Sequence, residues 1–178
     1  MDKSNSKQLS RTSSLIKNLT LSAVLIALTT TFILFVRIPA GVGIIHVGDS
    51  IIYLAACILP TPFALIAAAL GGAFANTFGG YFIYIIPTFI IKALVTLPYN
   101  SKSDRILTKR NMLMVIPAGA ITIIGYFFAT WILFDLSAAI PLIYGDLIQA
   151  SGSAILFIII AAALDKMGFK QRFMGRNI

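Results

Sequence analysis

His46 and Asp49 place an imidazole and a carboxylate three positions apart, a pair that could bind a metal ion or act as acid and base. Metal sites normally use three or four ligands, however, and no second histidine and no cysteine or glutamate cluster accompanies this pair. Hydrogen bonding to a polar ligand is therefore the better interpretation. We expect no metal ion and no cofactor.

A second polar set lies toward the C-terminal end of the chain. Asp146, Gln149 and Ser153 are spaced i, i+3 and i+7, so they share one face of a helix. Such a stripe within an apolar run should face protein or water rather than lipid. These side chains are candidates for ligand contact.

Two further sets leave alternatives open. Thr122, Tyr126 and Thr130 share a helix face, where hydrogen bonding between helices explains them at least as well as ligand contact does. Asn76 ends a ladder of small residues, which we interpret as close helix packing with the amide as the functional candidate; the ladder is Ala64, Ala68 and Gly72.

Lys92 lies inside an apolar run, eight residues before Asn100, or about 12 Å of helix. That depth is large for a side chain that reaches back to the surface. Burying the charge costs roughly 2.5 to 3.5 kcal/mol, so an internal partner or a polar cavity is expected. We favour an internal partner, an aspartate or main-chain carbonyls, over a ligand.

Catalysis is not expected from these residues. An intramembrane enzyme would need a nucleophile with a base, or a carboxylate cluster around a metal. The one histidine is far in sequence from Ser151 and Ser153, and no glycine-rich phosphate loop or paired-histidine zinc motif occurs. We therefore predict no catalytic residues and no enzyme.

The composition indicates whether the helices that carry these residues are surrounded by water or by lipid. Of the 178 residues, 58% are hydrophobic and 11% are charged, whereas a soluble domain has about 25% charged residues. So little polar surface excludes a soluble globule and indicates an integral membrane protein. The net charge of +8 does not indicate nucleic-acid binding, because the basic residues flank apolar runs. We expect no cleaved signal, since the first apolar run follows a polar segment and has no clear cleavage site.

Six apolar runs are candidates for membrane spans: Leu19–Val36, Ile44–Leu59, Phe63–Phe78, Tyr81–Tyr99, Met112–Phe134 and Ile140–Leu164. The second and third could instead form one kinked crossing, since only Pro60-Thr61-Pro62 separates them. Counting them as two places 12 of the 14 basic residues on one side of the membrane, as the positive-inside rule requires.

We therefore predict an all-α membrane protein with six transmembrane helices and both termini in the cytoplasm. Residues 1–18 form a basic cytoplasmic N-terminal segment, residues 19–164 the membrane domain, and residues 165–178 a basic cytoplasmic tail.

In this topology the outer ends of the spans gather the polar residues. They resemble an outward-facing cup for a small solute more than a channel, whose polar face would run the length of several spans. The predicted solute-binding residues are Arg37, His46, Asp49, Asn76, Tyr84, Lys92, Asp146 and Gln149.

The chain also resembles the substrate-binding S components of energy-coupling factor (ECF) vitamin transporters. The resemblance covers Leu19 to about Leu164, and its most characteristic parts are Ala23-Val24-Leu25-Ile26-Ala27, the loop leading to His46-Val47-Gly48-Asp49, and Leu59-Pro60-Thr61-Pro62-Phe63-Ala64-Leu65.

The resemblance implies a solute-capture subunit in a bacterial plasma membrane that works with a transmembrane coupling protein and two ATPase subunits. It favours a solute of the pyridoxine or hydroxymethylpyrimidine class. Ala23 and Ala27, spaced i and i+4, would dock on the coupling protein, although packing within the chain is an equal alternative. A ligand-free membrane scaffold is the alternative function.

Overall fold

The computed structural model describes residues 3–40 and 43–174 of the chain. It contains, within those ranges, eight α-helices, one 3-10 turn and one two-stranded hairpin. In chain order they are α1 (Lys3–Phe35), β1 (Arg37–Ala40), β2 (Gly43–His46), α2 (Gly48–Ile58), α3 (Thr61–Gly79), η1 (Phe82–Tyr84), α4 (Ile85–Thr96), α5 (Lys109–Leu113), α6 (Val115–Leu133), α7 (Leu136–Lys166) and α8 (Phe169–Met174).

Four helical segments among the described residues are long and apolar enough to cross a membrane: Arg11–Phe35, Thr61–Gly79, Lys109–Leu133 and Leu136–Lys166. Many of their large apolar side chains are exposed, including Ile132 and Ile155. Exposure of such side chains is expected where the surrounding solvent is lipid. The prediction of a multi-pass helical membrane protein is therefore confirmed. The apolar helices Gly48–Ile58 and Phe82–Thr96 are shorter, and the count of six spans stays a prediction.

The first predicted span is part of a longer helix. The sequence predicts Leu19–Val36, whereas α1 begins at Lys3 and takes in most of the predicted N-terminal segment. No glycine or proline occurs between Lys3 and Phe35, so nothing interrupts the helix on the polar side of the apolar run.

The second predicted span is wrong at its start. Ile44–His46 belongs to a β-hairpin, in which β1 and β2 pair antiparallel with Arg37 opposite His46, and α2 begins only at Gly48. A short apolar run does not distinguish strand from helix, and the β-branched Ile44 and Ile45 favour a strand. Gly48 permits close packing, because a Cβ atom there would overlap Ile33 Cγ1.

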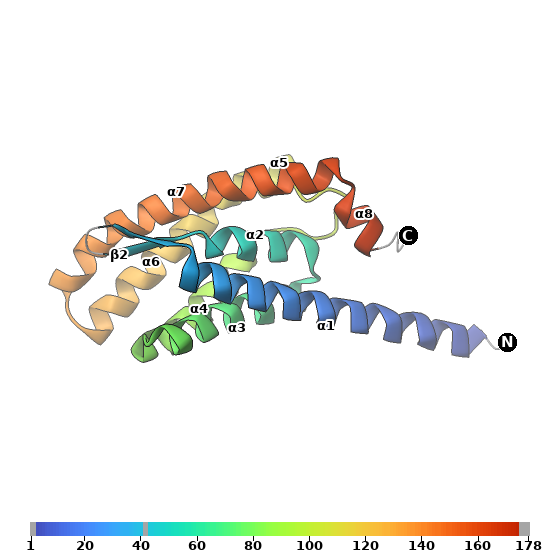
Figure 1. Ribbon diagram of the computed structural model, residues 1–178, viewed down its shortest axis with the longest axis horizontal. Coiled ribbons are helices and arrows are strands. Elements are labelled where there is room, and N and C mark those ends of the chain that lie inside the picture. Colours follow the sequence, from blue (N-terminus) through green and yellow to red (C-terminus); the bar gives the residue numbers. More distant parts are fainter. Residues whose placement is uncertain (1–2, 41–42, 175–178) are drawn as a thin grey trace.

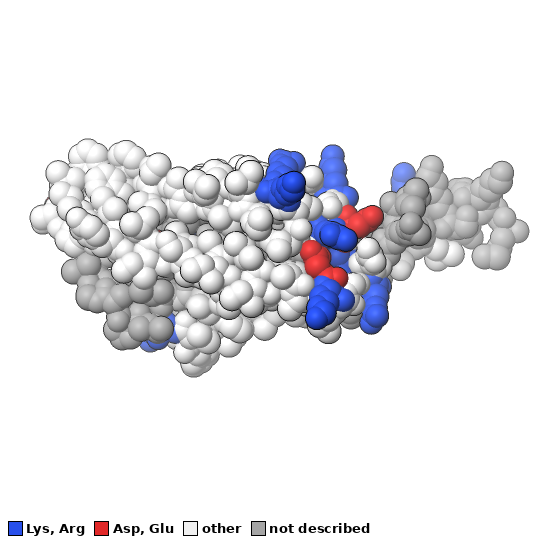
Figure 2. Space-filling model, turned by 90° about the horizontal axis from the view of Figure 1, so that it is seen from above, with Lys and Arg blue, Asp and Glu red and all other residues white. Residues whose placement is uncertain are grey.

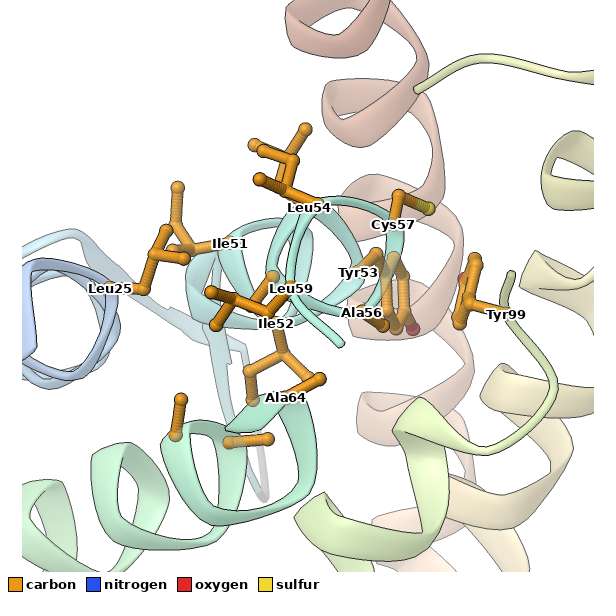
Figure 3. Packing of buried hydrophobic residues seen from close by; sticks show 14 of the residues in the cluster. Leu25, Ile51, Ile52, Tyr53, Leu54, Ala56, Cys57, Leu59, Ala64 and Tyr99 are labelled. Carbon is orange, nitrogen blue, oxygen red and sulfur yellow. The ribbon is translucent and has the colours of Figure 1, made fainter. Parts of the chain in front are cut away.

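Helix α2 is the centre of the fold. All eleven of its residues are buried. Figure 3 shows Leu25 of α1 on one side of α2, Ala64 of α3 on another, and Tyr99 facing Tyr53. The rings of Tyr53 and Tyr99 stack with centroids 5.3 Å apart, and Phe157 of α7 packs edge-on against both. A helix that is apolar nearly all round is expected in such an enclosed position.

The turn between α2 and α3 forms as predicted. Helix α2 ends at Ile58, Pro60 is the N-cap of α3, and Pro62 lies in its first turn. An N–H group in the first turn has no partner within the helix, so proline costs no helical hydrogen bond there.

The small-residue ladder of α3 is close packing, as predicted. Gly72 faces α4 so closely that an added Cβ would lie 2.8 Å from Thr88 Cγ2.

The long apolar helices alternate in direction between two ends of the body (Figure 1). The hairpin end carries β1–β2, the α3–α4 turn and the α6–α7 turn. The terminal end carries both chain termini, the α2–α3 turn and the segment 97–114. Figure 2 shows that, on the face in view, the charged side chains gather mainly at the terminal end.

The terminal end is closed by three buried or half-buried polar side chains that bind main chain, here called the terminal latch: Asp165, Lys170 and Asn111. Lys170 Nζ donates to the carbonyls of Cys57 and Ser101, at 2.6 and 2.7 Å. Two further bonds of the latch hold the segment before α5. The Asp165 carboxylate accepts from the amides of Ile106 and Leu107, both at 2.8 Å.

Asn111 completes the latch, since its amide group donates to the carbonyls of Asn100 and Ile106 and its oxygen accepts from the Asn100 amide. The latch therefore fixes the C-terminal end of α2 and the segment before α5 to the last two helices. Burial lowers the pKa of Lys170.

Candidate functional site

A buried ion pair lies at the centre of the polar residues in the hairpin half of the body. Lys92 Nζ of α4 donates to Asp49 Oδ1 of α2 at 2.6 Å, and both residues are 0% exposed. It is the one salt bridge recorded among the described residues. Asp49 is therefore the internal partner that the depth of Lys92 requires, because an isolated charge in a low-dielectric interior would be strongly unfavourable.

Helix α7 contributes the face whose spacing marked it as polar. Gln149 Nε2 donates to the second carboxylate oxygen of Asp49 at 3.1 Å, and Ser153 Oγ donates to the carbonyl of His46 at 3.4 Å. The i, i+3, i+7 face of this helix thus packs against the start of α2. Asp146 is one turn before Gln149 on that face.

Two buried atoms beside the pair have no hydrogen-bond partner among the described residues: Nδ1 of His46 and Oδ2 of Asp146. Asp146 interacts electrostatically with both Lys92 and Asp49, and His46 does so too. Buried polar atoms are usually hydrogen-bonded, so unpaired ones point to a missing partner such as a ligand or water.

A chain of hydroxyl and amide groups extends the site to three more elements. Asn76 Nδ2 of α3 donates to Thr88 Oγ1 of α4 at 2.7 Å and to the carbonyl of Tyr84 at 3.1 Å. The Tyr126 hydroxyl of α6 lies 3.0 Å from Thr88 Oγ1, and the Tyr84 hydroxyl lies 3.0 Å from Thr130 Oγ1.

The ring of Tyr126 joins the two halves of this arrangement, because Lys92 Nζ lies 5.1 Å from its centroid. We call the connected set the polar network: Asp49, Lys92, Gln149, Asn76, Tyr84, Thr88, Tyr126 and Thr130. Its members come from α2, α3, η1, α4, α6 and α7. Many donors and acceptors from several helices, gathered in one place, can bind a small polar solute.

The structure brings together seven of the eight residues that the sequence predicts for the site. Five belong to the polar network, and His46 and Asp146 lie beside it. Arg37 stands apart: it is exposed on β1, opposite His46 in the hairpin register. Arg37 lies in the same loop of the sequence as His46, but it is not a member of the polar network.

Sequence reasoning missed Thr88, which links Asn76 to Tyr126. Its spacing contained a signal, since Thr88 precedes Lys92 by four residues and therefore shares its helix face. The sequence leaves two interpretations open for Tyr126 and Thr130, and in the structure the hydroxyls of both contact another element.

The described residues include no group of three or more His, Cys, Asp or Glu side chains that could hold a metal ion. The hydrogen bonds of the site connect amides, hydroxyls, main-chain carbonyls, one ammonium and one carboxylate. Such an arrangement can recognise a solute by hydrogen bonding and charge.

Comparison with known protein families gives a match. The family model described as "ECF-type riboflavin transporter, S component" matches residues 13–166. No curated protein matches the chain. The resemblance seen in the sequence is therefore confirmed at the level of the family.

Membership of that family makes the chain a substrate-binding subunit of a transporter rather than an enzyme, and implies association with an ECF transmembrane and ATPase module. With its apolar helices it is a multi-pass membrane protein. The chain belongs to the family of ECF-type riboflavin transporter S components.

Proposed function

We propose that this chain captures a small vitamin from outside the cell, at the hairpin end, and delivers it through a coupling module driven by two ATPase subunits in a bacterial plasma membrane. The observation that carries the proposal is the polar network, flanked by the unpaired Nδ1 of His46 and Oδ2 of Asp146. A solute that bonds these atoms satisfies groups that are otherwise costly to bury.

The proposed solutes share a flat nitrogen heterocycle and at least one hydroxyl group, on the ring or on its side chain. Riboflavin is the vitamin in the family's description, and the resemblance in the sequence favours pyridoxine or hydroxymethylpyrimidine. Aromatic side chains suit such a ring: Tyr84 lies 6.5 Å from Tyr126 and 6.1 Å from Phe134, centroid to centroid. The three vitamins form the first binding panel.

Binding calorimetry with the purified chain tests the site. Gln149→Ala removes a donor to Asp49 and should weaken binding by about 1 to 3 kcal/mol, or roughly five- to 150-fold. Ser151→Ala is the matched control, because Ser151 is exposed on the same helix and its hydroxyl bonds its own helix at Leu147. Unchanged affinity in both Gln149→Ala and Asp146→Ala, with folding intact, would remove α7 from the site. If no vitamin binds the parent chain, the ligand-free scaffold becomes the better function.

We also propose six membrane crossings with both termini in the cytoplasm. A cysteine at the exposed Lys102, at the terminal end, should escape an impermeant thiol reagent in intact cells, whereas one at the exposed Ser137, at the hairpin end, should react. The native Cys57 is buried and should give little background. Labelling of Lys102→Cys in intact cells would reject this topology.

The proposed docking surface for the coupling protein is the face of α1 that carries Ala23 and Ala27. Both alanines are exposed, whereas Leu25 and Thr29 of the same helix are buried. Small side chains at i and i+4 let another helix approach closely.

Replacing both alanines by Trp should block assembly with the module and leave solute binding by the isolated chain nearly unchanged. Trp at both Ile155 and Ile159 is the matched control, because these residues are also exposed and spaced i and i+4, but on α7. Equal loss of assembly in both double variants would mean that bulk anywhere on the surface interferes. Loss of solute binding in the α1 variant would instead show that the alanines pack internally.

A further inference from the structure

The surface of the terminal end carries more positive charge than the fold uses. Residues 97–114 and 165–174 contain seven Lys and Arg residues and two Asp residues. Figure 2 shows basic side chains gathered at this end, on the face in view. Lys170 is buried in the terminal latch, whereas the other six are exposed: Lys102, Arg105, Lys109, Arg110, Lys166 and Arg172. The exposed cations are open to an anion from outside the chain.

The terminal latch brings together the segments that carry three of these cations. The Asp165 carboxylate accepts from the two amides that directly follow Arg105 in the chain, both at 2.8 Å. Arg105 and Lys166 therefore come from segments in direct contact. Arg172 comes from α8, which folds back after Gly168, and Arg172 Nε lies 3.9 Å from the position that a Cβ atom of Gly168 would take. We call Arg105, Lys166 and Arg172 the cation cluster.

The carboxylates nearby leave the cation cluster unpaired. Within the described ranges, the recorded salt bridge joins Lys92 to Asp49, far from this end in the sequence. Asp165 lies among the three cations, but both of its oxygens accept from main-chain amides. Asp104 is the other carboxylate, and it is exposed. Two guanidinium groups and one ammonium group are thus available, and a guanidinium matches the oxygens of a phosphate group.

Exposed apolar side chains next to the cation cluster favour a lipid over a soluble anion. Met167, which follows Lys166, is 65% exposed, and Leu113 and Ile116 are 60% and 70% exposed where α5 ends and α6 begins. In a membrane protein such side chains contact acyl chains, and cations beside them lie at the level of the headgroups. A phospholipid can contact both kinds of group, whereas a soluble anion contacts only the cations. In the proposed topology this end faces the cytoplasmic leaflet, where anionic lipids gather.

We propose that the cation cluster binds the headgroup of an anionic phospholipid, with the acyl chains along the exposed apolar side chains where α6 begins and α7 ends. The lipid then bridges the segment before α5, the end of α7 and α8, the same three parts that the terminal latch connects. Binding the folded chain and not the unfolded one raises stability. The inference does not depend on solute capture at the hairpin end.

Thermal unfolding of the delipidated, full-length chain in a neutral detergent tests the proposal. Phosphatidylglycerol should raise the melting temperature by about 3 °C or more beyond phosphatidylcholine with the same acyl chains. The double variant Arg105→Gln, Lys166→Gln should need at least ten-fold more phosphatidylglycerol for half of that rise, since each cation near an anionic surface contributes roughly five-fold in affinity. Raising the salt concentration should have a similar effect.

Two matched double variants separate the cluster from net charge. Arg11→Gln with Arg37→Gln removes the same charge from two exposed arginines elsewhere and should keep the preference for phosphatidylglycerol. Arg105→Lys with Lys166→Arg keeps the charge and should keep it too. If the Arg105, Lys166 variant does not fold, Arg172→Gln tests the same cluster, with an expected loss of about five-fold.

Three results would overturn the proposal. Equal melting temperatures in phosphatidylglycerol and phosphatidylcholine would show that headgroup charge is not recognised. Glycerol 1-phosphate that stabilises the chain as much as phosphatidylglycerol would show a site for free phosphate rather than for lipid. Equal losses in the cluster variant and in the Arg11, Arg37 variant would show that net charge, and not this cluster, determines the preference. Solute binding by the polar network could still be intact in each case, so the two proposals fail separately.

Discussion

The two ends of the helical body satisfy their buried polar groups in different ways. In the terminal latch, Lys170, Asp165 and Asn111 bond almost entirely to main-chain groups. In the polar network the bonds run mostly from side chain to side chain, as from Lys92 to Asp49. Main-chain partners are fixed once the fold is fixed, whereas side-chain partners can rearrange around a solute.

The difference extends to atoms without partners. The side-chain atoms of the latch are bonded, but beside the polar network Nδ1 of His46 and Oδ2 of Asp146 are not. Two tyrosine hydroxyls between the two regions, those of Tyr53 and Tyr99, are also buried without a partner among the described residues. We therefore propose a structural role for the latch and a binding role for the network.

The largest effect is expected from breaking the ion pair. Lys92→Met leaves the carboxylate of Asp49 buried without its cation, and should lower the free energy of unfolding by about 3 to 5 kcal/mol. Unfolding in mixed detergent micelles measures the loss. Adding Asp49→Asn should restore much of it, because the remaining buried charge is then removed. A loss below about 1 kcal/mol would show that water reaches Asp49 and that the pair is not truly enclosed.

The terminal latch should respond differently to the same kind of change. Lys170→Met strips a charged donor from the carbonyls of Cys57 and Ser101, at a cost of about 2 to 3 kcal/mol, since hydrogen bonds to charged groups contribute roughly 1.5 to 3 kcal/mol. No second side-chain replacement can restore the loss, because the partners are main chain. Lys166→Met, at an exposed lysine, is the matched control. Solute affinity should stay within two-fold, and a large drop would show that the two regions are coupled.

The pH dependence of unfolding sharpens this test. Burial lowers the pKa of Lys170 in the folded chain, so the unfolded chain binds more protons in the pH range below the usual lysine value of about 10.4. The contribution of this group to stability therefore rises as pH approaches that value and is lost as pH falls through the folded-state pKa. Lys170→Met should flatten that rise, whereas Lys166→Met should not.

A smaller loss of stability is expected where Gly72 of α3 packs closely against the polar network on α4. Gly72→Ala adds a Cβ 2.8 Å from Thr88 Cγ2 and 2.9 Å from Lys92 Cγ, and should cost about 1 to 3 kcal/mol by overpacking. It should also weaken solute binding by displacing both side chains. Gly152→Ala is the control, because a Cβ there meets nothing within 4 Å and should stabilise α7 by up to about 1 kcal/mol. Equal stability of the two variants would mean that α3 and α4 separate easily.

Much of the polar network could be predicted from local sequence. The two signals were the helical spacing of polar residues and the free-energy cost of burying the charge of Lys92. The i, i+3, i+7 spacing identified the face of α7, and the depth of Lys92 required a partner. The sequence did not identify that partner as Asp49, because pairing residues 43 positions apart depends on how α2 and α4 pack.

The remaining misses have physical causes of the same kind. Hydropathy is equally high in Ile44–His46 and in α2, so it could not show that a hairpin precedes the helix. The sequence places Lys170 in a basic tail, and in the structure it lies at the terminal end with the latch. That its ammonium is buried against main-chain carbonyls depends on the turn at Gly168, whose φ of 64° folds α8 back after α7.

The smallest effect concerns the hydroxyl chain of the network, for which the sequence allowed both helix packing and ligand contact. Thr130→Val is nearly isosteric and removes the partner of the Tyr84 hydroxyl, so it should cost about 0.5 to 1.5 kcal/mol. Thr122→Val is the matched control, because the Thr122 hydroxyl donates to the carbonyl of Ala118 in its own helix and does not join that helix to another element.

The outcomes separate the two roles of Thr130. If Thr130 only joins helices, stability falls and solute affinity changes little. If it orients Tyr84 toward the solute, affinity falls by more than the Thr122 variant shows, even at a temperature where both variants are fully folded. Identical behaviour of the two variants would mean that the 3.0 Å contact between Tyr84 and Thr130 contributes nothing, and would confine the polar network to the residues around Asp49 and Lys92.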